Sequence, residues 1–178
     1  MFRPVAVLLI LFLWPGAASA EVTPAQRAEL AVVVGEFVTA TRAKDTDRII
    51  AATPQRVFAH IARTAGIPLE QLLPALSAQI KTVMSQVTFV EISMSMDDAR
   101  YLQTPDGTDY VLIPTRMIMS MAGQPGRIKG EEFTLALIDE GEWRLMRVSE
   151  TAQLQILRQV YPSFAGVVFP KGSMQILE

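Results

Sequence analysis

Apolar residues recur with helical spacing over the first part of the chain. Three stretches within residues 23–84 show this pattern, and each places its apolar residues on a single face. The first begins at Thr23 and the second at Thr53, each followed by a proline, which is typical of a helix start; the third follows Pro68. We therefore predict amphipathic helices over about residues 23–84, with the charged segment 42–48 forming a solvated turn between the first two.

The apolar spacing changes from a helical period to alternation at Val87. Alternating stretches continue to residue 149, separated by short segments rich in Gly, Pro and Asp that are typical turn signals. Short connections join antiparallel neighbours, so we predict a meander of about five strands over residues 87–149. Helical spacing returns over residues 150–161, whereas residues 162–178 show no period and are expected to form an irregular tail.

Helices followed by a run of strands are typical of the α+β class, because helices with one apolar face need a sheet to cover it. We predict N-terminal amphipathic helices packed on a curved antiparallel sheet, plus a C-terminal helix, in a single domain over residues 21–178. The core where helices meet sheet is predicted to contain Phe37, Phe58, Leu76, Met94, Val111, Leu135 and Trp143.

Residues 1–20 follow neither pattern. Arg3 precedes a short apolar run over residues 5–14, and small residues end the segment at Ala20. This arrangement predicts a secretory signal peptide that is cleaved before Glu21. The apolar run has about half of the roughly 20 residues that a membrane-spanning helix needs, which favours a signal peptide over a permanent anchor. We expect a periplasmic or secreted protein with no stable membrane anchor after cleavage.

Composition narrows the possible functions. Half of the 178 residues are hydrophobic and 19% are charged, which is typical of a folded domain and excludes a disordered chain. The formal net charge of −2 provides no basic surface for phosphates, so nucleic acid is not an expected partner. The chain has no Cys and one His, which excludes thiolate chemistry and the usual metal clusters. We predict neither a metal nor a cofactor.

The order of amphipathic helices and hairpin-linked strands, together with an acidic-Gly turn leading into a Trp-bearing strand at residues 139–144, resembles the nuclear-transport-factor-2-like superfamily of cone-shaped, cystatin-like domains. The resemblance covers most of residues 21–178 and implies a pocket enclosed between sheet and helices. The C-terminal helix is additional to the family pattern, and a strand that is common among the family's early helices is not predicted. No catalytic motif of the family is recognised, so no residue role is carried over.

Few ionisable residues are candidates for catalysis. His60 is the one side chain that titrates near neutral pH without perturbation, but it lies away from the apolar centre of its helix and is expected at the surface. Asp97 and Asp98, with Tyr101 close in sequence, provide a possible base and hydroxyl donor for a cofactor-free lyase or isomerase. Two acids before a strand more often form a solvated turn, so this enzyme remains the alternative function.

The methionines suggest a binding surface. Alternation places Met94 and Met96 on one face of a strand, and Met117, Met119 and Met121 on one face of another. Flexible thioethers suit a pocket that accepts varied apolar ligands, although burial as ordinary core under the helices is the competing interpretation. We therefore predict an exported, non-catalytic domain that binds a small apolar molecule or another protein, with these five methionines as ligand-binding residues.

Export is the first testable prediction. Protein recovered from an exporting host should begin at Glu21, because signal peptidase accepts the small side chains of Ala18 and Ala20. Intact-mass measurement of the recovered protein checks this. Recovery of a full-length product from the cytoplasm alone would contradict the prediction.

Overall fold

The structure is a computed structural model in which residues 22–178 are described. The predicted signal peptide, residues 1–20, lies outside the described residues. Over residues 22–178, no helix combines the length and the apolar character that crossing a bilayer would require.

Four helices open the described chain, namely α1 (Pro24–Ala43), α2 (Thr46–Ala51), α3 (Gln55–Ala65) and α4 (Leu69–Ser85). The predicted start of α1 is confirmed, because the hydroxyl of Thr23 accepts a hydrogen bond from the Gln26 N–H at 3.2 Å and caps the helix. The segment 42–48 contains more than the predicted turn. It contains the first residues of α2, which is capped where the Asp45 carboxylate accepts from the Arg48 N–H.

The rest of the chain forms an antiparallel sheet and a C-terminal helix. The elements are β1 (Val87–Met94), β2 (Arg100–Gln103), β3 (Asp109–Met121), β4 (Arg127–Asp139), β5 (Glu142–Arg147), α5 (Thr151–Val160), a 3-10 turn over Pro162–Phe164 and β6 (Ser173–Leu177). The predicted α+β class is confirmed. The prediction of an irregular tail over residues 162–178 is wrong, because β6 joins the sheet by pairing with β4.

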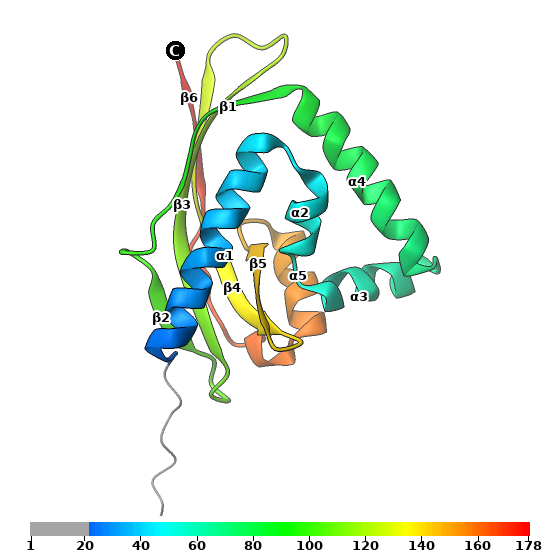
Figure 1. Ribbon diagram of the computed structural model, residues 1–178, viewed down its shortest axis with the longest axis vertical. Helices are drawn as coiled ribbons and strands as arrows, with labels where there is room; N and C mark the ends of the chain where they lie inside the picture. The colour runs from blue at the N-terminus through cyan, green and yellow to red at the C-terminus, as the bar shows by residue number, and fades with distance from the viewer. Residues whose placement is uncertain (1–21) are drawn as a thin grey trace, which may run out of the picture.

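The long β3–β4 hairpin is the centre of the sheet. One half of β3 pairs with β1 and the other half with β2, while β4 pairs with β6 and β5 in the same way. The sheet therefore has six strands where about five were predicted, but each outer strand covers only half of the hairpin. Figure 1 shows the half with β2 and β5 between α1 in front and α5 behind.

Successive residues of the hairpin face opposite layers, which we call the α1 face and the α5 face. On the α1 face, Val111 and Ile113 belong to a buried cluster with Leu30 of α1. On the α5 face, Leu112 and Leu135 belong to a second cluster, which includes Leu157 of α5, Phe164 and Phe169. The hairpin thus has an apolar core on each side, which is the expected result of a two-residue period.

The remaining helices pack mainly on one another. Ile50 of α2, Phe58 and Ala62 of α3, and Leu72 of α4 form a third buried cluster. The helix α4 leads from α3 back to β1 and forms the outer side of the helical layer (Figure 1). Pro74 lies inside α4, which continues past it to Ser85.

The predicted core is partly confirmed. Phe58, Val111, Leu135 and Trp143 are buried, as expected. Phe37, Leu76 and Met94 are only partly buried, at the margins of the clusters.

A buried carboxylate joins the helical layer to the sheet. The Asp139 side chain at the end of β4 is 1% exposed, and its Oδ2 accepts from the backbone N–H of Arg56 in the first turn of α3 at 3.3 Å. The Arg56 guanidinium lies 4.7 Å from the ring centre of Tyr161 and donates to the carbonyl of Val160 at 3.3 Å. These contacts connect β4, α3 and the end of α5. Burial raises the pKa of the Tyr161 hydroxyl well above its ordinary 10.0, and the neighbouring Asp139 carboxylate raises this pKa further.

The burial of the core predicts unequal costs for two leucine truncations. Leu135→Ala should destabilise the protein by about 3–5 kcal/mol, because Leu135 is fully buried between the sheet and α5. Leu76→Ala should cost roughly half as much, because its side chain is already partly in water. Urea unfolding of both variants checks this, and equal losses would contradict the description of the core.

The raised pKa of Tyr161 predicts a loss of stability in alkali. As pH rises through 10.0, the unfolded state loses the phenolic proton while the folded state keeps it, so the free energy of unfolding should fall. Tyr161→Phe should make this fall shallower, since Phe has no proton to lose. Unfolding curves between pH 7 and pH 11 measure the difference, with the neutral-pH stabilities as reference. Parallel curves for the two proteins would show that Tyr161 titrates normally.

Candidate functional site

The two predicted methionine rows lie on adjacent strands of the same sheet face. In the β1–β3 pair, Met94 is opposite Thr115, and Met117 is opposite Ile92. A register shift between Phe89 and Glu91 removes Val90 from the predicted alternation and leaves it half-exposed at the edge. Because of this shift, Phe89 rather than Val90 lies opposite the methionine row of β3, facing Met119. Met94 and the β3 methionines are therefore on the same face of the sheet.

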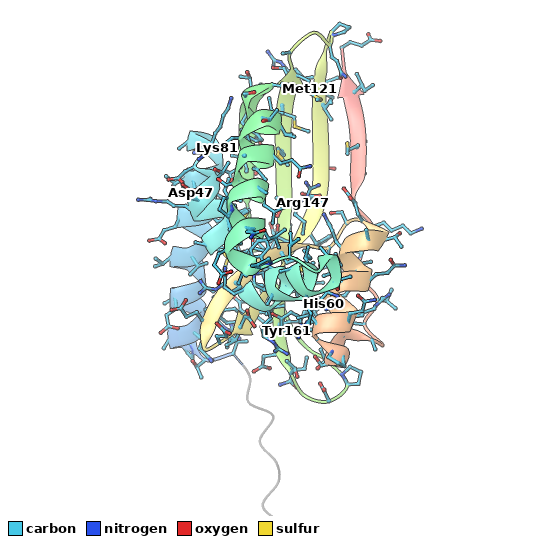
Figure 2. The ribbon with its side chains drawn as sticks, turned by 90° about the vertical axis from the view of Figure 1, so that its right-hand side faces the viewer. Asp47, His60, Lys81, Met121, Arg147 and Tyr161 are labelled. Carbon is cyan, nitrogen blue, oxygen red and sulfur yellow. The ribbon has the colours of Figure 1, made fainter. Side chains whose placement is uncertain are left out.

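The two rows nevertheless have different surroundings. Met94, and Met96 just after β1, pack against the buried cluster under α1, so they belong to the margin of the core. Met117 and Met119 lie farther along β3 and line an open cleft. Met121 lies near the tip of the β3–β4 hairpin, as its label in Figure 2 shows, and is not among the residues that line this cleft.

This cleft, which we call the methionine cleft, has a volume of about 370 Å³. Met117, Met119 and Gly130 form its floor, and Met174 of β6 forms a side. A Cβ atom built on Gly130 would meet no atom within 4 Å, so the floor has open space above it. The side chain of Met174 is 72% exposed, and that of Ile176, next along the same face of β6, is 78% exposed. The cleft therefore continues outward as an apolar surface.

One end of the methionine cleft is polar. The Glu132 side chain, only 9% exposed, accepts hydrogen bonds from the Arg147 guanidinium at 2.8 Å and from the Ser149 hydroxyl at 2.6 Å. Arg147 is 46% exposed and lines the cleft; Figure 2 shows it lower on the sheet than Met121. A guanidinium has five N–H donors, and the bond to Glu132 uses one of them. This end therefore offers the remaining N–H donors of Arg147, whose positive charge is already balanced by Glu132.

A row of threonines separates the cleft from the core under α1. The hydroxyls of Thr115 and Thr134 lie 2.8 Å apart and are buried, and Thr115 also donates to the carbonyl of Ile113 at 3.1 Å. Thr115 is opposite Glu132, and Thr134 is opposite Arg147. The apolar core thus ends in a hydrogen-bonded polar row before the cleft begins.

His60 lies at the junction of α3 and α5 and does not line the methionine cleft. Its Nε2 atom is 3.0 Å from the side-chain oxygen of Gln159, and its ring is partly exposed (Figure 2). This agrees with the expectation that His60 lies at the surface flank of its helix.

The acidic residues and the tyrosine of the predicted enzyme alternative make different contacts. Asp97 and Asp98 are exposed, and the Asp98 carboxylate accepts from the Ser95 hydroxyl at 2.7 Å. Tyr101 is packed against the cluster under α1, with the Arg27 guanidinium 4.2 Å from its ring centre. In the described part of the chain, no group of three or more acidic or His side chains is placed to hold a metal ion.

Comparison of the chain with protein families, curated proteins and solved structures finds no match. The fold alone defines the class of this protein. It is an α+β domain whose helices pack on a curled antiparallel sheet, an arrangement compatible with a cone-like fold. Evidence for function therefore comes from the geometry of the clefts.

Proposed function

We propose that this protein is an exported, non-catalytic domain of the nuclear-transport-factor-2-like kind that binds a small, mainly apolar molecule in the methionine cleft. The observation that supports this most directly is the position of Met117, Met119 and Met174, which line a cleft open to solvent. Three methionines around a hollow that a glycine leaves open suit a ligand of variable shape, because the thioether side chain is flexible and polarisable.

The polar end of the methionine cleft would orient the bound ligand. A ligand with one polar group would place that group beside Arg147 and Ser149 and its apolar part over Met117 and Met119. Since Glu132 already balances the charge of Arg147, an uncharged hydroxyl or carbonyl oxygen suits this end without leaving a buried charge unpaired.

The area of the cleft limits the expected affinity. Burying about 100 Å² of apolar ligand surface contributes roughly 2.5 kcal/mol before the costs of association. The proposal is therefore weak and broad recognition of apolar molecules, without fine selectivity among them.

Two other functions are weaker proposals. A protein partner is favoured by the exposed Met174 and Ile176, which continue the apolar surface along β6. A lyase or isomerase using Asp97, Asp98 and Tyr101 has less support, because the Ser95 hydroxyl donates to Asp98 and the Arg27 guanidinium lies over the ring of Tyr101.

A fluorescent lipophilic probe tests the ligand-binding proposal. The probe should bind the wild-type protein, and Met119→Lys should abolish most of this binding, because it places a charge on the apolar floor. The fold should survive, since Met119 is only partly buried and a lysine can extend into solvent. Fluorescence titration measures binding, and thermal unfolding measures the fold.

Val168→Lys is the matched control, because Val168 is an exposed apolar residue outside the methionine cleft. This variant should bind the probe as the wild type does. Equal loss in both variants would show that the probe binds the surface non-specifically. If no probe binds, or if Met119→Lys unfolds the domain, the methionines serve as core and a protein partner becomes the better proposal.

A further inference from the structure

The strand β6 forms an outer edge of the sheet, and no other strand of residues 22–178 pairs with that edge. Its one neighbour is β4, which pairs with all five residues of Ser173–Leu177 without a register shift. No backbone hydrogen bond joins the opposite side of β6 to another described segment. Figure 2 shows β6 along the side of the sheet, with no element beyond it. The outward N–H and C=O groups of β6 therefore form a template on which another strand can pair.

Two other edge strands of the sheet are protected against such pairing. The edge of β1 has the register shift that follows Phe89, and the Arg42 guanidinium donates to the Ile92 carbonyl at 2.9 Å. The edge of β5 is closed where the Leu145 N–H donates to the Ala52 carbonyl at 2.8 Å. Bulges, covering segments, charged side chains and prolines keep edge strands from pairing with other chains. The strand β6, with the sequence SMQIL, has none of these.

We propose that a second copy of this chain pairs with β6 in an antiparallel arrangement, about a twofold axis at Gln175. A twofold contact brings the same surface of both copies together, so the strand must be complementary to itself. With Gln175 opposite its counterpart, all five residues of each strand are paired, and Met174 of each copy lies opposite Ile176 of the other. This dimer goes beyond the function proposed for the methionine cleft and does not depend on it.

The exposed side chains of β6 complement one another in this register. Met174 is 72% exposed and Ile176 is 78% exposed, and alternation places both on the face that carries the methionine cleft. Opposite residues of an antiparallel pair have Cβ atoms about 4.5–5.5 Å apart, so each Met174 contacts an Ile176 of the second copy. On the other face, the two Gln175 amides lie side by side and have both donors and acceptors to exchange.

The charges at the ends of β6 favour a second copy as the partner. Lys171 precedes the strand and Glu178 follows it, and both are exposed without an ion-pair partner among residues 22–178. Antiparallel pairing places Lys171 of each copy at the end where Glu178 of the other lies, so opposite charges meet at both ends. On the neighbouring strand β4, Lys129 is already paired with Glu131 at 2.7 Å. The contact is therefore complementary in charge as well as in shape.

The length of β6 limits the strength of the dimer. A contact centred on two five-residue strands is smaller than the roughly 1,200–2,000 Å² that stable interfaces bury. We therefore expect a reversible dimer that forms as the protein concentration rises from about 10 μM to about 1 mM. No larger species should form, because a twofold contact is closed.

Sedimentation velocity of the purified protein over this concentration range tests the proposal. Gln175→Lys and Gln175→Glu should each weaken the dimer at least several-fold, because like charges then face each other across the axis. Mixed in equal amounts, the two variants should regain a dimer, since opposite charges then face each other. Gln175 is exposed and lies opposite Lys129 of β4, so Gln175→Glu in particular should keep β6 in place.

A cross-link tests the register. The chain has no cysteine, so Gln175→Cys provides a single thiol at the axis and should give a disulfide-linked dimer on mild oxidation. Ser173→Cys is the matched control on the same strand and face. In the proposed register the two substituted positions are about 13 Å apart, too far for a disulfide. Cross-linking of both variants at the same rate would contradict the register and with it the proposal.

Val90→Lys is the control for the opposite edge of the sheet, because Val90 is half-exposed on β1. It should leave the dimer unchanged, and loss of the dimer in this variant would place the contact at β1. A monomer at 1 mM, or a mixture of the two Gln175 variants that stays monomeric, would also overturn the proposal. Failure of the lipophilic probe to bind would refute the function proposed for the methionine cleft without affecting this test.

Discussion

The alternation of side chains along the β3–β4 hairpin is the constraint on which the rest of the structure depends. Because successive residues face opposite layers, Val111 and Ile113 can meet α1 while Leu112 and Leu135 meet α5. A shift of one residue in the pairing would exchange the two faces and expose both cores. The helices α1 and α5 are therefore held on opposite sides of one hairpin.

The length of the hairpin explains why a cleft forms at all. Each of its strands has 13 residues and extends on the order of 40 Å, whereas the buried clusters under α1 and α5 take their hairpin residues from the half that carries β2 and β5. An apolar face that continued beyond the helices would leave an uncovered core. The hydrogen-bonded row of Thr115 and Thr134 ends that core. Beyond it, the same face carries methionines around Gly130, and β6 extends them outward.

Much of the fold could be predicted from the sequence, because the signals for it are local. The cap at Thr23, the helical stripe that follows it and the alternation after Val87 each involve neighbouring residues. The helix α2 was missed because its six residues are too few to show a stripe and begin in a charged segment. The strand β6 was missed because it is exposed, so its formation depends on a distant partner, β4, rather than on its own pattern.

Predicting where the candidate site residues lie requires the register of the strands as well as the alternation of apolar and polar residues. Alternation correctly placed Met117 and Met119 on one face, but it could not show that Met94 lies at the margin of the core while the other two line an open cleft. That difference depends on where α1 ends over the sheet. The pairing of Glu132 with Arg147 likewise follows from the alignment of β4 with β5, across an intervening turn whose geometry the sequence leaves open.

Trp143 shows the same dependence most clearly. Trp143 was predicted as core, and it is buried; the sequence carried no signal that its indole N–H would lack a partner. The reason is that β5 is an edge strand, and its outer side is covered by the chain after α2, where the Leu145 N–H donates to the Ala52 carbonyl at 2.8 Å. This single contact closes the edge at Leu145, and a separate cleft lies beside it, between α1, α2 and residues 143–144. The residues that pack around Trp143 thus bury its indole N–H without supplying an acceptor for it.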